Sequence, residues 1–124
     1  MSDPTETPDL IERLMLANLL EVFNERDRAR RRAAIDRVYS DDIVFSDPEA
    51  LVVGRDAIDA KVQQLLDDAP GFVFSPAGAV LQNHDLGYLT WKFGPEGHEP
   101  VVTGMDICFV RDGLIVKAYT LLLS

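Results

Sequence analysis

The sequence predicts a single α+β domain, with helices in its first half and an antiparallel sheet in its second half. Before residue 70, apolar residues recur every three or four positions, as they do along amphipathic helices. After residue 72, apolar and polar residues alternate, as they do along half-buried strands. A chain of 124 residues that is 47% hydrophobic is long enough for one hydrophobic core and too short for two.

The first half is expected to contain a tail and three helices. Residues 1–8 are interpreted as a flexible N-terminal tail and residues 9–124 as one domain. Thr7 can cap a first helix that runs to about Asn24; the second covers about residues 28–39, and the third begins after Gly54 and ends at Pro70. The apolar residues expected to face the core are Leu10, Leu14, Met15, Ala17, Leu19, Val22 and Phe23, then Ala29, Ala33, Ile35 and Val38, then Ile58, Val62, Leu65 and Leu66.

A short strand is predicted over residues 43–47, between the second and third helices. Pro48 stops this strand because proline cannot donate to a sheet ladder. Since side chains alternate along a strand, Ile43, Phe45 and Asp47 share one face. Asp47 is therefore expected at the end of an inward-facing row.

Four further strands are predicted at about residues 72–82, 87–93, 101–110 and 114–122. The inward rows are expected to be Leu89, Trp91 and Phe93 on the second of these strands, and Val116, Ala118, Thr120 and Leu122 on the last. The third strand is apolar on both faces, so a second layer should cover its outer residues Met105, Ile107 and Phe109. A second copy of the sheet is the most economical cover, which predicts a homodimer.

Asp106 is the most unusual residue of the chain, because it lies within an apolar strand. An ionised carboxylate in apolar surroundings costs several kcal/mol unless it finds hydrogen bonds, so Asp106 either has such partners or keeps its proton. Two interpretations stay open for each acid. Asp106 is either a catalytic acid or a structural acid bonded to a neighbour such as Tyr39, and Asp47 is either a proton acceptor or a turn residue bonded to its own backbone.

Charge and composition argue against several classes of partner. A formal net charge of -9 disfavours nucleic acid, and the arginines between residues 26 and 32 are interpreted as a solvated face paired with acids. No apolar run reaches the roughly 20 residues that cross a bilayer. The lone Cys108 and the lack of a signal sequence favour a cytoplasmic protein. No metal-ligand spacing or glycine-rich phosphate loop is found, so no cofactor is expected.

Three local motifs occur in an order that resembles a known superfamily. They are residues 39–48 (YSDDIVFSDP), 54–58 (GRDAI) and 112–115 (DGLI). Together they resemble the SnoaL-like branch of the nuclear transport factor 2-like superfamily, over about residues 9–124. The resemblance implies a cone-shaped fold, in which a curved antiparallel sheet wraps around three N-terminal helices and encloses a pocket. The superfamily includes isomerases, polyketide cyclases and members without catalytic activity, so the fold alone does not assign a function.

The ketosteroid isomerases of this superfamily offer a mechanistic comparison. Their general base falls in a segment that matches residues 46–48, which places Asp47 there, and their protonated carboxylic acid matches Asp106. The position of their oxyanion-binding tyrosine matches Leu19, which cannot donate a hydrogen bond. Tyr39 could partly replace this donor.

Two functions follow as hypotheses. In the first, Asp47 moves a proton next to the carbonyl of an apolar substrate, while protonated Asp106 stabilises the enolate. The ligand-binding residues would be Leu19, Tyr39, Phe45, Trp91 and Phe93. In the second, the domain is a non-catalytic ligand-binding or dimerisation module of the same fold.

Overall fold

The computed structural model describes residues 8–123. The helices are α1 (Pro8–Ala17), which continues into the π-helix η1 (Asn18–Phe23), α2 (Arg28–Val38) and α3 (Arg55–Asp67). The strands are β1 (Tyr39–Ser46), β2 (Leu51–Val53), β3 (Phe72–Pro76), β4 (Leu81–Asn83), β5 (Leu86–Pro95), β6 (Val102–Arg111) and β7 (Leu114–Leu122). Apart from Pro8, the expected N-terminal tail and the expected cap Thr7 lie outside the described residues.

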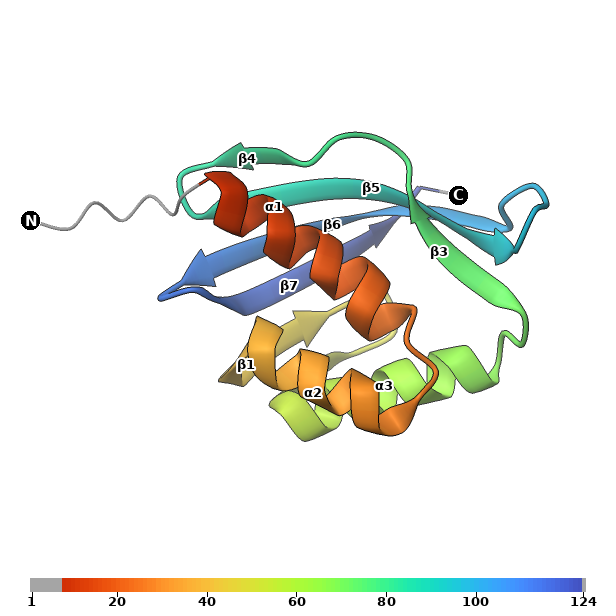
Figure 1. The fold of residues 1–124 in the computed structure, drawn as a ribbon, viewed down its shortest axis with the longest axis horizontal. Coiled ribbons are helices and arrows are strands. Elements are labelled where there is room, and N and C mark those ends of the chain that lie inside the picture. Colours follow the sequence, from red (N-terminus) through yellow and green to blue (C-terminus); the bar gives the residue numbers. More distant parts are fainter. Residues whose placement is uncertain (1–7, 124) are drawn as a thin grey trace, which may run out of the picture.

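The strands form one curved sheet that wraps around the helices, as the resemblance implied. Its order is β2-β1-β7-β6-β5-β3, and β4 pairs with β5. Figure 1 shows α1 lying across one face of the sheet, while α2 and α3 lie side by side next to β1. The sheet is mixed and not purely antiparallel, because β1 and β7 run parallel. Parallel strands need a long connection, and here the connection contains every element from β2 to β6.

The first helix changes its geometry halfway along. Residues 18–23 form a π-helix, whose turn is wider than the 3.6-residue turn of an α-helix. From the end of α1 through η1, buried residues recur in pairs every four positions, a repeat longer than the 3.6-residue turn of an α-helix. The pairs are Leu14 and Met15 in α1, then Asn18 and Leu19, and Val22 and Phe23 in η1. The π-turn therefore keeps one face of the helix on the core up to Phe23.

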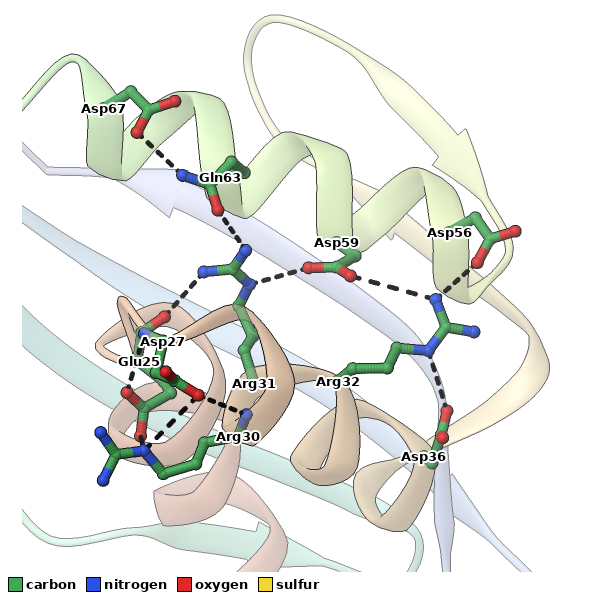
Figure 2. A network of polar contacts seen from close by, with 10 residues as sticks. All are labelled: Glu25, Asp27, Arg30, Arg31, Arg32, Asp36, Asp56, Asp59, Gln63 and Asp67. Carbon is green, nitrogen blue, oxygen red and sulfur yellow. Dashed lines mark hydrogen bonds and ion pairs between the residues drawn. The ribbon is translucent and has the colours of Figure 1, made fainter.

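The buried face of α2 differs from the predicted one. Ile35 and Val38 are buried as expected, but Ala29 and Ala33 are exposed, and Arg31 and Ala34 take their places. The reason is a polar contact between α2 and α3. Arg31, only 1% exposed, donates to Asp59 over 2.7 Å, to the backbone oxygen of Glu25 over 2.8 Å, and to Gln63 (Figure 2).

Three other arginines of α2, Arg30, Arg32 and Arg37, pair with acids, as the sequence predicts. Arg32 lies between Asp36 and Asp56, and Arg30 between Glu25 and Asp27 (Figure 2). Arg31 departs from the expectation of a solvated face because it is buried, and Arg26 departs from the expected acid pairing because it donates to the backbone oxygens of Leu66, Ala69 and Phe72. The three bonds of Arg31 link α2 to α3 and to the turn after η1.

Two strands depart from the predicted alternation. On β7 a bulge at Val116 shifts the register, so that Ile115 is fully buried and Val116 faces outward, whereas Ala118 faces inward as predicted. The strand expected over residues 72–82 is divided into β3 and β4, because the backbone leaves the ladder after Pro76. Neither feature produces a signal in the hydrophobic pattern.

Candidate functional site

A cavity of about 230 Å³ opens inside the curved sheet. It lies between η1, α3 and the strands β1, β3, β5, β6 and β7. Its lining residues are mostly apolar: Leu19, Phe23, Phe45, Asp47, Pro48, Glu49, Leu65, Phe74, Trp91, Phe93, Val102, Asp106, Thr120 and Leu122. Such a lining, with a few convergent polar groups, is typical of sites for small apolar ligands.

The aromatic residues of the cavity wall hold one another in place. The ring of Phe74 stacks on Phe93 at 4.0 Å and meets Trp91 edge-on at 5.2 Å. Phe23 packs against both Phe74 and Phe45, at 6.0 and 5.6 Å. These edge-to-face and stacked contacts favour fixed ring orientations, so the cavity has a defined shape without a ligand.

Asp106 is the buried polar centre of the cavity. It is 6% exposed, and its carboxylate accepts three hydrogen bonds. Oδ1 accepts from the Trp91 indole over 3.1 Å and from the Thr120 hydroxyl over 2.8 Å, and Oδ2 accepts from the amide of Asn18 over 3.1 Å. Burial raises the pKa of Asp106 from 3.8 to about 6, and the three hydrogen bonds act in the opposite direction.

A second layer of contacts lies behind Asn18. The hydroxyl of Tyr39 donates to Oδ1 of Asn18, whose amide nitrogen donates to Asp106. Tyr39 is fully buried in the core and is not among the cavity-lining residues. Burial raises the pKa of the Tyr39 hydroxyl well above its usual value, with further contributions from Cys108 and Asp106, so this hydroxyl keeps its proton at neutral pH.

Asp47 lies at the mouth of the same cavity, on the turn between β1 and β2. Its Oδ1 accepts from the backbone amides of Glu49 and Ala50, both over 2.9 Å, and its Oδ2 pairs with Lys61 at 3.0 Å. Burial lowers the pKa of Lys61, but its hydrogen bonds to Glu49 and Asp47 outweigh this effect and leave the pKa raised. The contacts of Asp47 are thus those of a turn residue with an added ion pair.

The cavity brings together most of the residues that the sequence singled out. Leu19, Phe45, Trp91 and Phe93 line it together with the two acids, whereas Tyr39 reaches it only through Asn18. Sequence reasoning missed Asn18 altogether. The one signal was a polar amide at a helical position that faces the core.

The described part of the chain, residues 8–123, contains no group of three or more side chains that could hold a metal ion. Over the same range, no helix combines the length and apolar character needed to span a membrane.

A family model for the SnoaL-like domain matches residues 16–118, which is most of the chain. The chain belongs to the SnoaL-like domain family. The superfamily resemblance that the motifs suggested is thereby confirmed. No curated protein sequence matches this SnoaL-like domain.

Solved structures agree on the fold of this SnoaL-like domain. A candidate isomerase of the SnoaL-like family from Agrobacterium tumefaciens superposes with a TM-score of 0.87 at 20% identity, covering 94% of this chain and 99% of the other. A candidate SnoaL-like polyketide cyclase from a Jannaschia species gives 0.69 at 16% identity, covering 95% and 90%. A candidate ketosteroid isomerase from Kribbella flavida gives 0.67 at 14% identity, covering 94% and 79%. At these identities the likeness shows the fold alone.

Proposed function

We propose that this SnoaL-like domain binds a small apolar carbonyl compound and catalyses proton transfer next to the carbonyl, without a cofactor, with Asp106 as the group that exchanges the proton. One observation carries this proposal. A carboxyl group with a pKa of about 6 lines a cavity whose walls are otherwise mostly apolar. A general base acts best when its pKa lies near the working pH.

Asp106 acts as the base in this proposal, because all three of its neighbours donate to it and so favour the carboxylate. The C–H bond next to the carbonyl breaks, its proton passes to an oxygen of Asp106, and its electron pair forms the enolate. The same carboxyl group then returns the proton to another carbon. The Thr120 hydroxyl makes the shortest of the three bonds to Asp106, 2.8 Å, and this bond weakens once the carboxyl is protonated.

The sequence-based hypothesis assigns the roles the other way round, with Asp47 as the base and protonated Asp106 as the donor to the enolate. The two assignments predict opposite pH dependence. If Asp106 is the base, activity falls as the pH drops below about 6. If protonated Asp106 is the donor, activity falls as the pH rises above that value.

The size of the cavity limits the ligand. An engineered apolar cavity of about 150 Å³ is known to hold one benzene molecule. A cavity of about 230 Å³ therefore suits a compound of one or two rings. A larger substrate would have to extend through the mouth beside Glu49 and Leu122.

Deuterium exchange at the carbon next to the carbonyl tests this proposal without knowledge of the natural substrate. Cyclohexenone and tetralone are incubated in D₂O with the wild-type protein, and exchange is followed by NMR. Asp106→Asn should reduce the protein-dependent rate by at least about 100-fold, whereas Asp47→Asn should have a smaller effect. Glu96→Gln, in the exposed turn between β5 and β6 and away from the cavity, is the matched control and should leave the rate unchanged. A wild-type rate in Asp106→Asn would overturn the assignment.

A non-catalytic ligand-binding module is the second candidate. Leu19, which lines the cavity, favours it, because the resemblance matches this residue to the oxyanion-binding tyrosine of the isomerases, and a leucine has no hydrogen-bond donor to offer. In that case the same ketones would bind, as seen by quenching of Trp91 fluorescence, but would exchange no faster than in buffer.

The proposed assembly is a homodimer that covers the outer face of β6. Met105, Ile107 and Phe109 on this face are each only partly buried by their own chain. The ring of Phe109 meets Tyr119 of β7 edge-on at 6.4 Å, so the apolar face extends over two strands. A face of this kind supports an isologous contact between two copies.

A further inference from the structure

Asn18 is the first residue of the π-helix, and its side-chain amide forms hydrogen bonds with both the buried Tyr39 and Asp106. It is 2% exposed, which is unusual for an asparagine. Asn18 and its neighbour Leu19 are both buried at the start of η1. Leu19 lines the cavity, and the Asn18 amide meets Asp106 from the helix side.

We propose that Tyr39 and Asn18 are positioning residues that act in series: the Tyr39 hydroxyl orients the Asn18 amide, and the oriented amide holds the Asp106 carboxylate in its ionised form, aimed into the cavity. The role in catalysis rests on the function proposed above. The series of contacts from Tyr39 through Asn18 to Asp106, called the relay below, rests on the hydrogen bonds between these residues.

The first step of the argument is the direction of the bond from Tyr39. The proton of a tyrosine hydroxyl can be donated once, and here it goes to Oδ1 of Asn18. An asparagine amide has an acceptor end and a donor end. Once Oδ1 is engaged by Tyr39, the donor end must face the other way, toward Asp106.

The second step is what this donor does to Asp106. A hydrogen bond to the charged form of an acid favours that form, so the Asn18 amide lowers the pKa of Asp106 against the effect of burial. Without the Tyr39 hydroxyl, the amide is free to turn its oxygen toward Asp106. Two facing oxygen acceptors repel each other unless the carboxyl is protonated.

The surroundings of Asp106 leave few other groups that could set its charge. Trp91 of β5 and Thr120 of β7 face it as neutral donors. Tyr39 of β1 and Cys108 of β6 also interact with it electrostatically, and both have a raised pKa and stay neutral near pH 6. The acids Asp47 and Glu49 share the cavity, at its mouth.

The protonation of Asp106 can be followed through the side chain of Trp91. Trp91 is the only tryptophan, and its indole N–H donates directly to Asp106. The ¹H–¹⁵N signal of this indole should therefore titrate with Asp106, with a midpoint near pH 6 in the wild-type protein. Asp106→Asn should abolish this titration, which confirms the assignment of the signal.

Removal of either relay residue should raise the midpoint. Tyr39→Phe and Asn18→Leu should each shift it upward by at least half a pH unit, and the double variant should shift it no further than Asn18→Leu alone, because the two residues act in series. Tyr88→Phe is the matched control and should leave the midpoint unchanged. An unchanged midpoint in a folded Tyr39→Phe protein, or fully additive shifts, would overturn the relay.

A measurement on the wild-type protein covers the case in which a variant fails to fold. The side-chain amide signals of Asn18 should be protected from solvent exchange and should move with the same midpoint as the Trp91 indole. Amide signals that do not respond to pH would refute the proposal. These readouts do not require turnover, so absence of ketone exchange would overturn the proposed function and leave the relay standing.

Discussion

Asp106 and Thr120 are direct cross-strand partners on β6 and β7, and the Thr120 hydroxyl donates to Asp106 over 2.8 Å. The register of two neighbouring strands thus fixes a donor against the buried carboxyl. Thr120→Val keeps the shape of the side chain but removes this donor, so the pKa of Asp106 should rise above about 6. The Trp91 indole titration measures the shift. Thr90→Val on the neighbouring strand β5 serves as the control. An equal midpoint of the Trp91 indole titration in wild type and Thr120→Val would contradict this expectation.

The stability of the protein should depend on pH through Asp106. Its pKa is about 6 in the folded state against an ordinary value of 3.8, so the folded state binds a proton more tightly than the unfolded state. The contribution of this group is most favourable below pH 4, declines as the pH rises from 4 to 6, and stays constant above that. A shift of this size corresponds to about 3 kcal/mol.

Asp106→Asn removes this contribution and leaves the other carboxyl groups in place. The difference in unfolding free energy between wild type and Asp106→Asn should therefore change by roughly 2 to 3 kcal/mol between pH 4 and pH 7, in favour of the variant at the higher pH. Urea denaturation at several pH values measures it. A difference that does not vary with pH would show that Asp106 does not titrate in this range.

Gly104 faces Trp91 across the strand pair β5 and β6, and a methyl group at Gly104 would lie 2.5 Å from the indole ring and 2.8 Å from the backbone oxygen of Leu121. Because backbone cannot yield easily, Gly104→Ala should displace the indole and break its bond to Asp106. We expect a loss of about 1 to 3 kcal/mol in stability. The Trp91 indole signal should also lose its response to pH near 6. An alanine at position 97 would be strained because the φ of Gly97 is positive, so Gly97→Ala is not a suitable control. Ala77→Gly, in the turn after β3, is used as the control instead.

Arg31 and Arg30 are adjacent but should differ in their effect on stability. Replacement of the buried Arg31 by Ala removes its bonds to Asp59, to Gln63 and to the backbone oxygen of Glu25, and should cost about 3 kcal/mol. The side chain of Arg30 is 76% exposed, so Arg30→Ala should change stability by less than about 1 kcal/mol. Urea denaturation compares the two. Similar losses in both variants would contradict the buried role of Arg31.

The apolar outer face of β6, formed by Met105, Ile107 and Phe109, leads us to expect a homodimer. Ile107→Glu places a charge in the centre of this face and should convert dimers into monomers, as measured by light scattering after size-exclusion chromatography. Leu81→Glu, on the exposed strand β4, should leave the dimer intact. A wild-type protein that is already monomeric at high concentration would refute the dimer proposal.

Much of the fold follows from sequence periodicity. The alternation along β5 correctly placed Leu89, Trp91 and Phe93 inside, and the period of the helices located all three of them. The errors have physical causes. Arg31 is buried because Asp59 compensates its charge, and partners on another helix cannot be read from local hydrophobicity. The bulge at Val116 adds one residue to β7, and a pattern of period two cannot reveal such an insertion.

The sequence predicts the two acids of the candidate site but not the residues that bond to them. The sequence indicates Asp106 because a carboxylate in an apolar strand is energetically costly, and Asp47 because it ends an inward-facing row of a strand. Asn18 produces no comparable signal, since a single amide on an amphipathic helix is common on the solvent side. Its role depends on the π-turn and on contacts with β1 and β6, which are distant in sequence.

The parallel pairing of β1 with β7 has a consequence for synthesis of the protein. During translation, the edge of β1 that pairs with β7 stays unpaired until residues 114–122 have left the ribosome, because β7 is the strand that pairs with this edge. Contacts between segments so far apart are formed slowly. The nascent chain therefore exposes an unpaired β1 edge until β7 has been made, and the ligand cavity, which Thr120 and Leu122 of β7 help to line, cannot be complete before then.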